Sequence, residues 1–334
     1  MTHEKKLEFT EITIPVPWGH ISGRWYGDHT VRPLLALHGW LDNCGSFAKL
    51  APLLIQTIGS VLCIDLPGHG YSTHLPPGTV YHSLEYVRAV LRLMKVYNWP
   101  KISLLGHSMG GAVVFFFAAL YPTKVDVLIG VDAIKRPDLK PQDKIEYFRH
   151  AMGKALQDNQ RLVDDTSQQE PPNYTFAECE QLLHKGSGYS VDLENCKYIL
   201  ERNLSRSQKY PERYYFSRDT RLKYITALDG DHALFEAMAM RISEAAVPYV
   251  VIKAGASNYM DDESMQLIRL LEKHNPNFET HVIANGKHHV HLNEAPVVAE
   301  LITSFLKRHR LLTVVRAEQP GVENKNETVA KGKL

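Results

Sequence analysis

Cysteine is scarce in this chain of 334 residues, which contains only four. None of them, Cys44, Cys63, Cys179 and Cys196, stands at a C-x-x-C spacing from another. Because disulfide frameworks and cysteine zinc sites depend on close or regular spacings, the sequence predicts neither. Cys63 lies within an apolar stretch, so we expect it to be a small buried core residue.

A long apolar run and an excess of charge of one sign are also missing. The first residues, Met-Thr-His-Glu-Lys-Lys, contain no apolar signal core. The apolar run at residues 112–120 is too short to span a bilayer. With 38 basic and 37 acidic residues, the chain lacks the positive excess that nucleic-acid binding requires. We therefore expect no nucleic-acid partner, no membrane span and a cytoplasmic location.

The C-terminal segment suggests a second location. The chain ends in Gly332-Lys333-Leu334, which resembles the peroxisomal Ser-Lys-Leu address with glycine in the first place. A peroxisomal location is therefore the alternative to the cytoplasm. Beyond about Thr313 the sequence is polar and charged, and we expect residues 313–334 to form a disordered tail.

Strand and helix patterns alternate along much of the chain. Apolar runs that are typical of strands buried on both faces occur at residues 34–37, 60–64, 102–105, 127–131, 248–254 and 278–283. Residues with helical spacing separate them, for example at 46–55 and 83–97. The stretch at 10–17 reads as a strand with 20–27 as its hairpin partner, and its two prolines favour an edge position. The alternation predicts an α/β fold with a mostly parallel, doubly wound sheet.

A polar insertion interrupts this alternation. Strand patterns disappear between about residues 135 and 246, and helical periodicity is found at 145–156, 175–184, 191–202 and 232–245. The insertion follows the strand that ends at Asp132, and so begins at the carboxyl edge of the sheet, where ligands of such folds bind. We expect a core of residues 1–134 and 247–312, with residues 135–246 as a mostly helical cap, or lid.

One pentapeptide, Gly106-His107-Ser108-Met109-Gly110, joins the strand at 102–105 to the apolar run at 112–120. A G-x-S-x-G sequence between a strand and a helix places its serine on a tight turn above the helix N-terminus. Glycines are needed because a β-carbon at Gly106 or Gly110 would collide with neighbouring atoms. The pattern predicts Ser108 as a nucleophile and the N–H of Met109 as an oxyanion donor.

This pentapeptide and three other phrases resemble the α/β-hydrolase superfamily. The others are His38-Gly39-Trp40, Asp65-Leu66-Pro67-Gly68-His69-Gly70 and Gly286-Lys287-His288-His289, and all four stand in the family's order. The resemblance covers residues 10–310 apart from much of the insertion. Residues 38–43 and 216–222 are similar to the serine hydrolase-like (kraken-like) proteins in particular. The resemblance implies an α/β-hydrolase fold with a cap, and cofactor-free serine hydrolase chemistry.

The resemblance also implies which residues work with Ser108. The family's catalytic histidine lies on the loop after the last strand, where His288 matches it better than the adjacent His289. Lys287 stands where the family usually has glycine. Trp40, on the loop after the strand that ends at Leu37, matches the second backbone donor of the oxyanion hole. Three other residues of the family's phrases are expected to shape or pack loops: His38, Asp65 and His69. His291 is likewise expected to cap or pack.

The acid that completes a Ser-His-acid triad is left open. In the family's commoner position, at the end of a turn that begins at Gly255, this chain has Asn258, which is neutral and cannot stabilise an imidazolium. Asp132 matches the position that some lipases of this fold use, and it is our leading candidate. Asp261 or Asp262 is the alternative. In a third interpretation, Asn258 only orients the histidine and activity is low.

Other chemistries fit the sequence less well. Epoxide hydrolases and haloalkane dehalogenases of this fold have aspartate where this chain has Ser108. No Walker A or dinucleotide glycine pattern is present, so no nucleotide cofactor is expected. His288, His289 and His291 lack carboxylate or cysteine ligands at matching spacing, so no metal site is expected either.

We therefore expect a serine hydrolase that cleaves a small-molecule carboxylic ester through an acyl-enzyme on Ser108, with amides and thioesters as less favoured substrates. The alternative is a hydrolase-fold protein with weak or no catalytic activity that binds a small ligand or a protein partner under its lid. The substitution at Asn258 favours this alternative.

Overall fold

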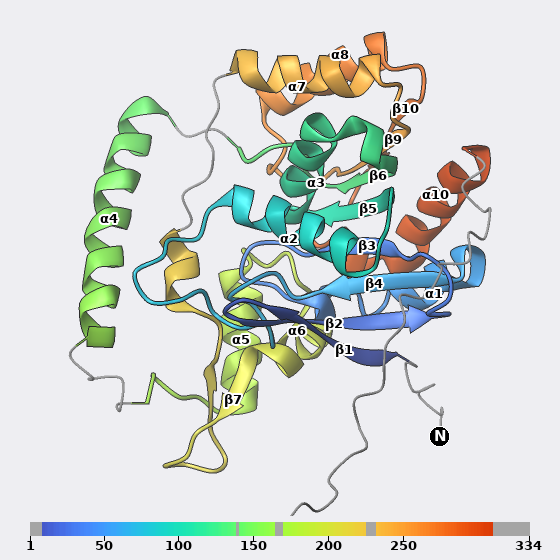
Figure 1. The fold of residues 1–334 in the computed structure, drawn as a ribbon. Coiled ribbons are helices and arrows are strands. Elements are labelled where there is room, and N and C mark those ends of the chain that lie inside the picture. The colour runs from blue at the N-terminus through green and yellow to red at the C-terminus, as the bar shows by residue number, and fades with distance from the viewer. Residues whose placement is uncertain (1–8, 138–139, 164–169, 225–231, 310–334) are drawn as a thin grey trace, which may run out of the picture.

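An eight-stranded sheet forms the centre of the computed structural model, which describes residues 9–309 except 138–139, 164–169 and 225–231 (Figure 1). Its strands are β1 (Thr10–Val16), β2 (Gly19–Gly27), β3 (Leu34–Leu37), β4 (Ser60–Ile64), β5 (Ile102–His107), β6 (Val125–Val131), β9 (Tyr249–Ala254) and β10 (Phe278–Ile283). They lie in the order β1-β2-β4-β3-β5-β6-β9-β10. β2 is antiparallel to both neighbours, and all pairs from β4 to β10 are parallel. The predicted sheet and its edge hairpin are confirmed.

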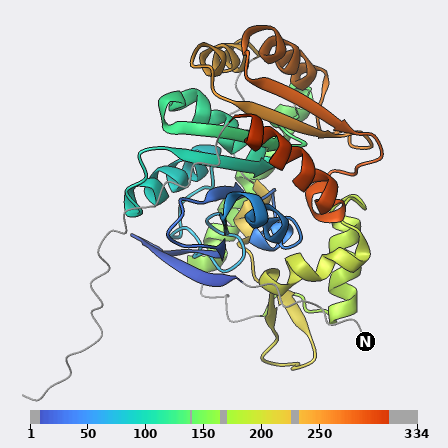
Figure 2. The same ribbon diagram turned by 90° about the vertical axis from the view of Figure 1, so that its right-hand side faces the viewer.

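Helices cover both faces of the sheet. One face carries α2 (Ser83–Val96), α3 (Met109–Leu120), α7 (His232–Glu244) and α8 (Asp262–His274). The other carries α1 (Ala51–Ile58) and α10 (Ala295–Arg308), and Figure 2 shows α10 lying across it. Successive strand residues point to opposite faces, so Leu104 of β5 joins one apolar cluster and Leu105 the other. Both faces are therefore apolar, which explains the unbroken apolar runs of the central strands.

The helix expected at residues 46–55 is divided in two. Residues Cys44–Phe47 form a 3₁₀ helix (η1), in which the Asn43 side chain accepts a hydrogen bond from the N–H of Gly45. The α-helix, α1, begins only at Ala51, with Pro52 in its first turn. Proline favours the start of a helix because it has no N–H to donate and its φ angle is already helical. The expectation of one continuous helix is therefore wrong.

The insertion contains helices and one small antiparallel sheet. Its elements are α4 (Pro141–Val163), α5 (Phe176–Gly186), η4 (Leu193–Asn195), α6 (Cys196–Asn203), β7 (Leu204–Arg206), β8 (Tyr214–Phe216) and η5 (Thr220–Tyr224). Around α5 and α6 a small apolar cluster forms, and Leu292 of α9 (Val290–Asn293) joins it. α4 runs along one side of the molecule, apart from the sheet (Figure 1). The pairing of β7 with β8 was not expected from the sequence.

α7 belongs spatially to the core, although the sequence suggests that it is part of the insertion. It packs against α3 and α8, and the ring of its Phe235 lies 5.8 Å from the ring of Phe116 in α3. The boundary between cap and core thus lies before α7, which differs from the expected boundary at residue 246. The expected tail, residues 313–334, lies outside the described residues.

Within the described ranges, no helix combines the length and the apolar character that are needed to cross a membrane.

Candidate active site

Ser108 lies on a strained turn between β5 and α3. Its φ of 52° falls in the left-handed region that residues other than glycine rarely adopt. A β-carbon at Gly106 would lie 2.3 Å from the carbonyl oxygen of Gly110, and one at Gly110 would lie 2.0 Å from the carbonyl oxygen of Leu37. Both distances are far below contact distance, so this turn requires glycine at each position. The packing supports the reason that the sequence pattern gave for the two glycines.

Hydrogen bonds join three of the residues singled out from the sequence. His288 Nδ1 lies 2.6 Å from Asp132 Oδ2, and His288 Nε2 lies 2.9 Å from Ser108 Oγ. A carboxylate can only accept a hydrogen bond, so Nδ1 carries the proton and Nε2 accepts from the serine hydroxyl. This is the arrangement in which a histidine can remove the proton of a serine while an acid stabilises the resulting imidazolium.

Asp132 is held in place by backbone groups as well as by His288. It follows β6 with a φ of 48° and is fully buried. Its N–H donates to the carbonyl oxygen of Ile252 at 2.8 Å, and its Oδ1 accepts from the N–H of Ala254 at 2.9 Å. Because both bonds lead to the neighbouring strand β9, they fix the direction in which Oδ2 points.

The other acid candidates lie elsewhere. Asn258 and Asp262 are exposed. Asp261 precedes α8, where its Oδ1 accepts from the N–H of Ser264 at 2.8 Å and its Oδ2 from the ammonium of Lys135 at 3.0 Å. The structure thus brings Asp132 to His288 and engages Asp261 as a helix cap and ion-pair partner.

Tyr259 is a site residue that the sequence did not suggest. Its ring stacks on the ring of His288, with centroids 4.3 Å apart and planes 29° apart. Its hydroxyl forms a hydrogen bond with Ser108, and burial raises the pKa of the phenol. The hydroxyl is therefore protonated at neutral pH and can donate. The only sequence signal was its position directly after Asn258, in the turn where the family's commoner acid lies.

The loop after β3 approaches the serine closely. A β-carbon at Gly39 would lie 3.2 Å from the β-carbon of Ser108. His38 shapes this loop, since its Nδ1–H donates to the carbonyl of Gly39 at 2.8 Å and its Nε2 accepts from the N–H of Leu66 at 2.9 Å. Burial lowers the pKa of His38, which keeps the imidazole neutral in this role.

The two expected oxyanion donors directly follow the residues of this close approach: Trp40 follows Gly39, and Met109 follows Ser108. Met109 is the first residue of α3, where backbone N–H groups have no partner within the helix. The indole N–H of Trp40 donates to the carbonyl oxygen of Leu222 at 2.7 Å. This bond attaches the loop that carries Trp40 to η5 of the insertion. The Trp40 side chain is half exposed.

Three further histidines and Asp65 have separate partners. His289 contacts Asp42 and Ser190. His291 is fully buried, and its ring lies 5.0 Å from that of Phe47. Asp65 accepts from the N–H groups of Cys44 and Tyr71. His69 accepts from the N–H of Leu41. These contacts agree with the packing and turn-forming roles expected for Asp65, His69 and His291.

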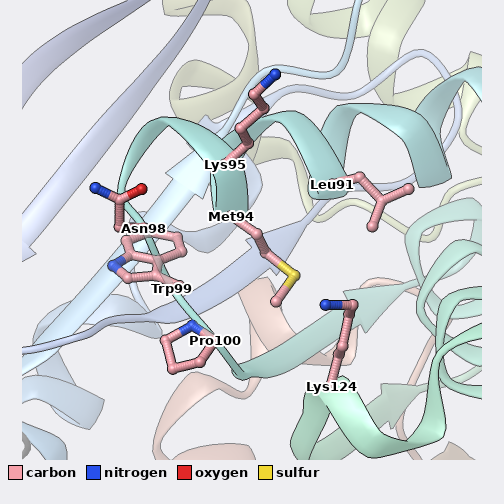
Figure 3. A pocket seen from close by; sticks show the side chains of 7 residues that line it. All are labelled: Leu91, Met94, Lys95, Asn98, Trp99, Pro100 and Lys124. Carbon is pink, nitrogen blue, oxygen red and sulfur yellow. The ribbon is translucent and has the colours of Figure 1, made fainter.

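A pocket of about 330 Å³ lies at the opposite edge of the sheet (Figure 3). It is lined by the end of α2, the residues before β5 and Lys124, and Met94 and Lys124 point towards each other across it. Ser108 follows β5, whereas Pro100 in the pocket precedes it. Because ligands of such sheets bind at the carboxyl ends of the strands, this pocket is not part of the candidate active site.

Comparison with known proteins defines the class. The chain belongs to the α/β-hydrolase fold family, whose model matches residues 32–295. It is 34% identical to a probable serine hydrolase of Drosophila melanogaster, over 89% of this chain and 87% of that protein. It is 31% identical to serine hydrolase-like protein 2 of Homo sapiens, over 91% of this chain and 96% of that protein.

A solved structure supports the fold. A hypothetical protein from Pseudomonas aeruginosa PAO1 is similar with a TM-score of 0.72 and 26% identity, over 89% of this chain and 99% of that chain. The superfamily, the serine hydrolase-like group and the fold that the sequence phrases implied are thus confirmed.

Proposed function

We propose that this protein is a serine hydrolase that cleaves a small carboxylic ester through an acyl-enzyme on Ser108. The observation that carries the proposal is the continuous hydrogen-bonded series from Asp132 through His288 to the Ser108 hydroxyl. Relatives named as serine hydrolases and serine hydrolase-like proteins support the reaction class. Amides and thioesters would pass through the same intermediates and are the less favoured substrates.

In the first half of the reaction, Ser108 Oγ attacks the ester carbonyl carbon as its proton moves to His288 Nε2. Asp132 Oδ2 stabilises the imidazolium through the bond to Nδ1–H. The N–H groups of Met109 and Trp40 stabilise the oxyanion of the tetrahedral intermediate. The bond to the leaving alcohol then breaks, and Nε2 returns the proton to the alcohol oxygen.

In the second half, a water molecule replaces the alcohol. His288 Nε2 takes a proton from the water as its oxygen attacks the acyl carbon. Collapse of the second tetrahedral intermediate breaks the bond to Ser108 Oγ and returns the proton to that oxygen. The acid product leaves, and the enzyme returns to its starting state with no cofactor involved.

The direct test is labelling with a fluorophosphonate, which reacts with activated serines. We expect the folded protein to become labelled on Ser108, as located by mass spectrometry, and Ser108→Ala to remain unlabelled. His288→Ala should lose labelling and the hydrolysis of p-nitrophenyl esters together. Folded protein that is neither labelled nor active would instead support a hydrolase-fold protein that binds its ligand without cleaving it.

A further inference from the structure

A second cluster of polar side chains lies directly beside the candidate active site. It consists of Asp42 from the loop after β3, His107 from the end of β5 and His289 from the loop after β10. Asp42 Oδ2 lies 3.2 Å from His289 Nε2 and 3.8 Å from His107 Nδ1, and all three atoms lie within 4.8 Å of one another. At most 8% of any of these side chains is exposed. The cluster therefore has no ready access to bulk water.

The proton on His107 is fixed by its backbone partner. Its Nε2 lies 2.9 Å from the carbonyl oxygen of His288, which can only accept, so Nε2 carries the hydrogen. Nδ1 then carries a lone pair, and it is a buried atom for which the described residues provide no hydrogen-bond partner.

Contacts of the same kind indicate which ring nitrogen of His289 carries the proton. Its Nδ1 lies 2.7 Å from Ser190 Oγ, whose own hydrogen is directed to the carbonyl oxygen of Ser187 at 2.7 Å. Nδ1–H then donates to Ser190, and the lone pair of Nε2 faces the Asp42 carboxylate. Two acceptors at 3.2 Å repel each other unless a proton or a metal ion lies between them.

The backbone leaves room on one side of the cluster. A β-carbon at Gly39 would lie 3.0 Å from both Asp42 Oδ2 and His107 Nδ1. Any residue other than glycine would therefore place a carbon atom against both of these acceptor atoms. With glycine at this position, residue 39 itself puts no side chain beside them, and the β-carbon of Ser108 is the next nearest atom.

We propose that Asp42, His107 and His289 bind a divalent transition-metal ion such as Zn²⁺. Two imidazole nitrogens and one carboxylate oxygen form a known zinc ligand set. In metal sites the second nitrogen of each histidine usually donates to a carbonyl or another acceptor, as His107 does to His288 and His289 to Ser190. Ligand atoms of a tetrahedral zinc site are about 3.4 Å apart, so binding draws the two nitrogens towards each other.

The sequence gave no indication of this site, because Asp42 stands 247 residues before His289. The carboxylate missing from the histidine-rich phrase near the C-terminus comes from the loop after β3 instead. An ion here would connect the loop after β3, the end of β5 and the loop after β10, next to the candidate active site, since His107 precedes Ser108 and His289 follows His288.

The test is metal binding to the full chain after removal of metals with a chelator. We expect calorimetry to show one Zn²⁺ ion bound per chain, and the thermal midpoint to rise by at least about 2 °C with excess Zn²⁺. Co²⁺ bound in place of Zn²⁺ should show the visible absorption that is typical of cobalt with a low coordination number. Asp42→Asn and His289→Gln should each weaken binding by about 100-fold or more, and Ser190→Ala by about 10-fold to 100-fold.

His281→Gln is the matched control, because it removes a histidine that contacts a carboxylate, Glu279, away from the cluster. It should bind Zn²⁺ like the unchanged protein. Circular dichroism identifies any variant that fails to fold, and Ser190→Ala decides the matter if the ligand variants do not fold. Equal affinity of the unchanged protein and the folded variants, or no binding at all, would overturn the proposal and assign the position between Asp42 and His289 to a proton.

Discussion

At the scale of a residue, one oxygen atom of Asp132, the Oδ2 that faces His288, determines where the histidine proton lies. In Asp132→Asn, the amide oxygen can still accept from the N–H of Ala254. The amide nitrogen then faces His288 Nδ1 and donates to it, which moves the histidine proton to Nε2, the atom that must accept from Ser108. We expect kcat for ester hydrolysis to fall by about 10⁴-fold.

The exposed Asp262→Asn is the control for this prediction and should keep full activity. Steady-state kinetics on a p-nitrophenyl ester measures both variants, and circular dichroism checks their folding. An Asp132→Asn protein with near-normal kcat would mean that Asp132 is only a structural acceptor between β6 and β9.

Tyr259 allows the stacking and the hydroxyl to be separated. Tyr259→Phe keeps the ring against His288 and removes the hydrogen bond to Ser108. One hydrogen bond is worth about 1 kcal/mol, so we expect kcat to fall roughly 5-fold to 10-fold with KM little changed. Tyr259→Ala should cost more, because His288 then loses the ring that holds its plane.

The exposed Tyr210→Phe serves as the comparison for Tyr259 and should behave like the unchanged protein. Fluorophosphonate labelling rates provide a second measurement of the same effect. If Tyr259→Phe and Tyr259→Ala are equally impaired, the hydroxyl carries the effect and the stacking contributes nothing.

Local sequence predicted some of these residues and not others. Ser108 and His288 lie in phrases whose neighbours restrict the backbone, so their positions were foreseeable. Asp132 was foreseeable only as the leading candidate among several acids, because aspartates at neighbouring positions fit the sequence pattern too, and only the packing of β6 against β9 distinguishes it. Asp42 and Tyr259 lie in or beside family phrases, but no pattern indicated their contacts, since these are made across the fold.

At the scale of elements, hydrogen bonds made by a buried ion pair attach η5 to the loop before α2. The guanidinium of Arg221 binds Asp219 at 2.6 Å and donates to the carbonyl oxygens of Leu75, Pro76 and Thr79. Asp219 also accepts from the hydroxyl of Tyr81. Both charged side chains are at most 9% exposed. The segment before α7 is thus attached to the loop that precedes α2.

This ion pair makes stability depend on pH. Burial acts to raise the pKa of Asp219, but hydrogen bonds from Arg221 outweigh it and hold the pKa below its usual value. The pair therefore stabilises the fold fully above the pKa of unfolded aspartate, and this contribution is lost as pH falls through the folded pKa. We expect Asp219→Asn to lower stability most at neutral pH and least in acid.

Urea unfolding at several pH values measures this difference. At neutral pH the loss should be roughly 3 to 5 kcal/mol, because the Arg221 charge remains buried without a partner. An equal loss at every pH would contradict the ion-pair account and would point to a packing defect.

The element boundaries were predictable to different degrees. The central strands were predictable from their apolar runs, because burial on both faces makes successive residues of a strand apolar. The helix at 46–55 was divided because the cap at Asn43 and the proline at the start of α1 start two separate turns. The strands β7 and β8 have three residues each, too few for an alternating pattern to be recognised. α7 was assigned to the cap because its sequence pattern does not indicate whether it packs against the cap or against the helices of the core.

At the scale of the whole molecule, a buried ion network joins the insertion to the sheet. Arg202 of α6 binds Asp65, which follows β4, at 2.7 Å and Glu11 of β1 at 2.5 Å, and the Arg202 and Asp65 side chains are fully buried. Arg24 of β2 binds both Glu11 and Glu201. The edge strand β1, its neighbour β2 and the cap helix α6 are thus connected by adjacent charges.

Replacement of Arg202 should therefore destabilise the whole fold. We expect Arg202→Met to lower the free energy of unfolding by roughly 3 to 5 kcal/mol, because Asp65 is left buried without its countercharge. Denaturant unfolding followed by circular dichroism measures the change. Arg149→Met, which removes an exposed pair with Glu146 on α4, is the control and should leave the midpoint unchanged.

A small effect of Arg202→Met would mean that water enters to solvate Asp65. The family phrases predicted the α/β-hydrolase fold, and the loss of strand patterns after Asp132 predicted the place of the insertion. They could not predict this network, because its members stand up to 191 residues apart in the chain and share no local pattern.

The triad geometry also has a consequence for how the protein reaches its native state. His288 stands 156 residues from Asp132 and 180 residues from Ser108, and their contacts need β6, β9 and the loop after β10 to be in register. Contacts between residues so distant in the chain form late, because closing the loops costs entropy before any bond repays it. In a refolding experiment, recovery of ester hydrolysis should therefore lag behind recovery of the helical circular dichroism signal. The delay in hydrolysis would then measure the rate of the last step of folding.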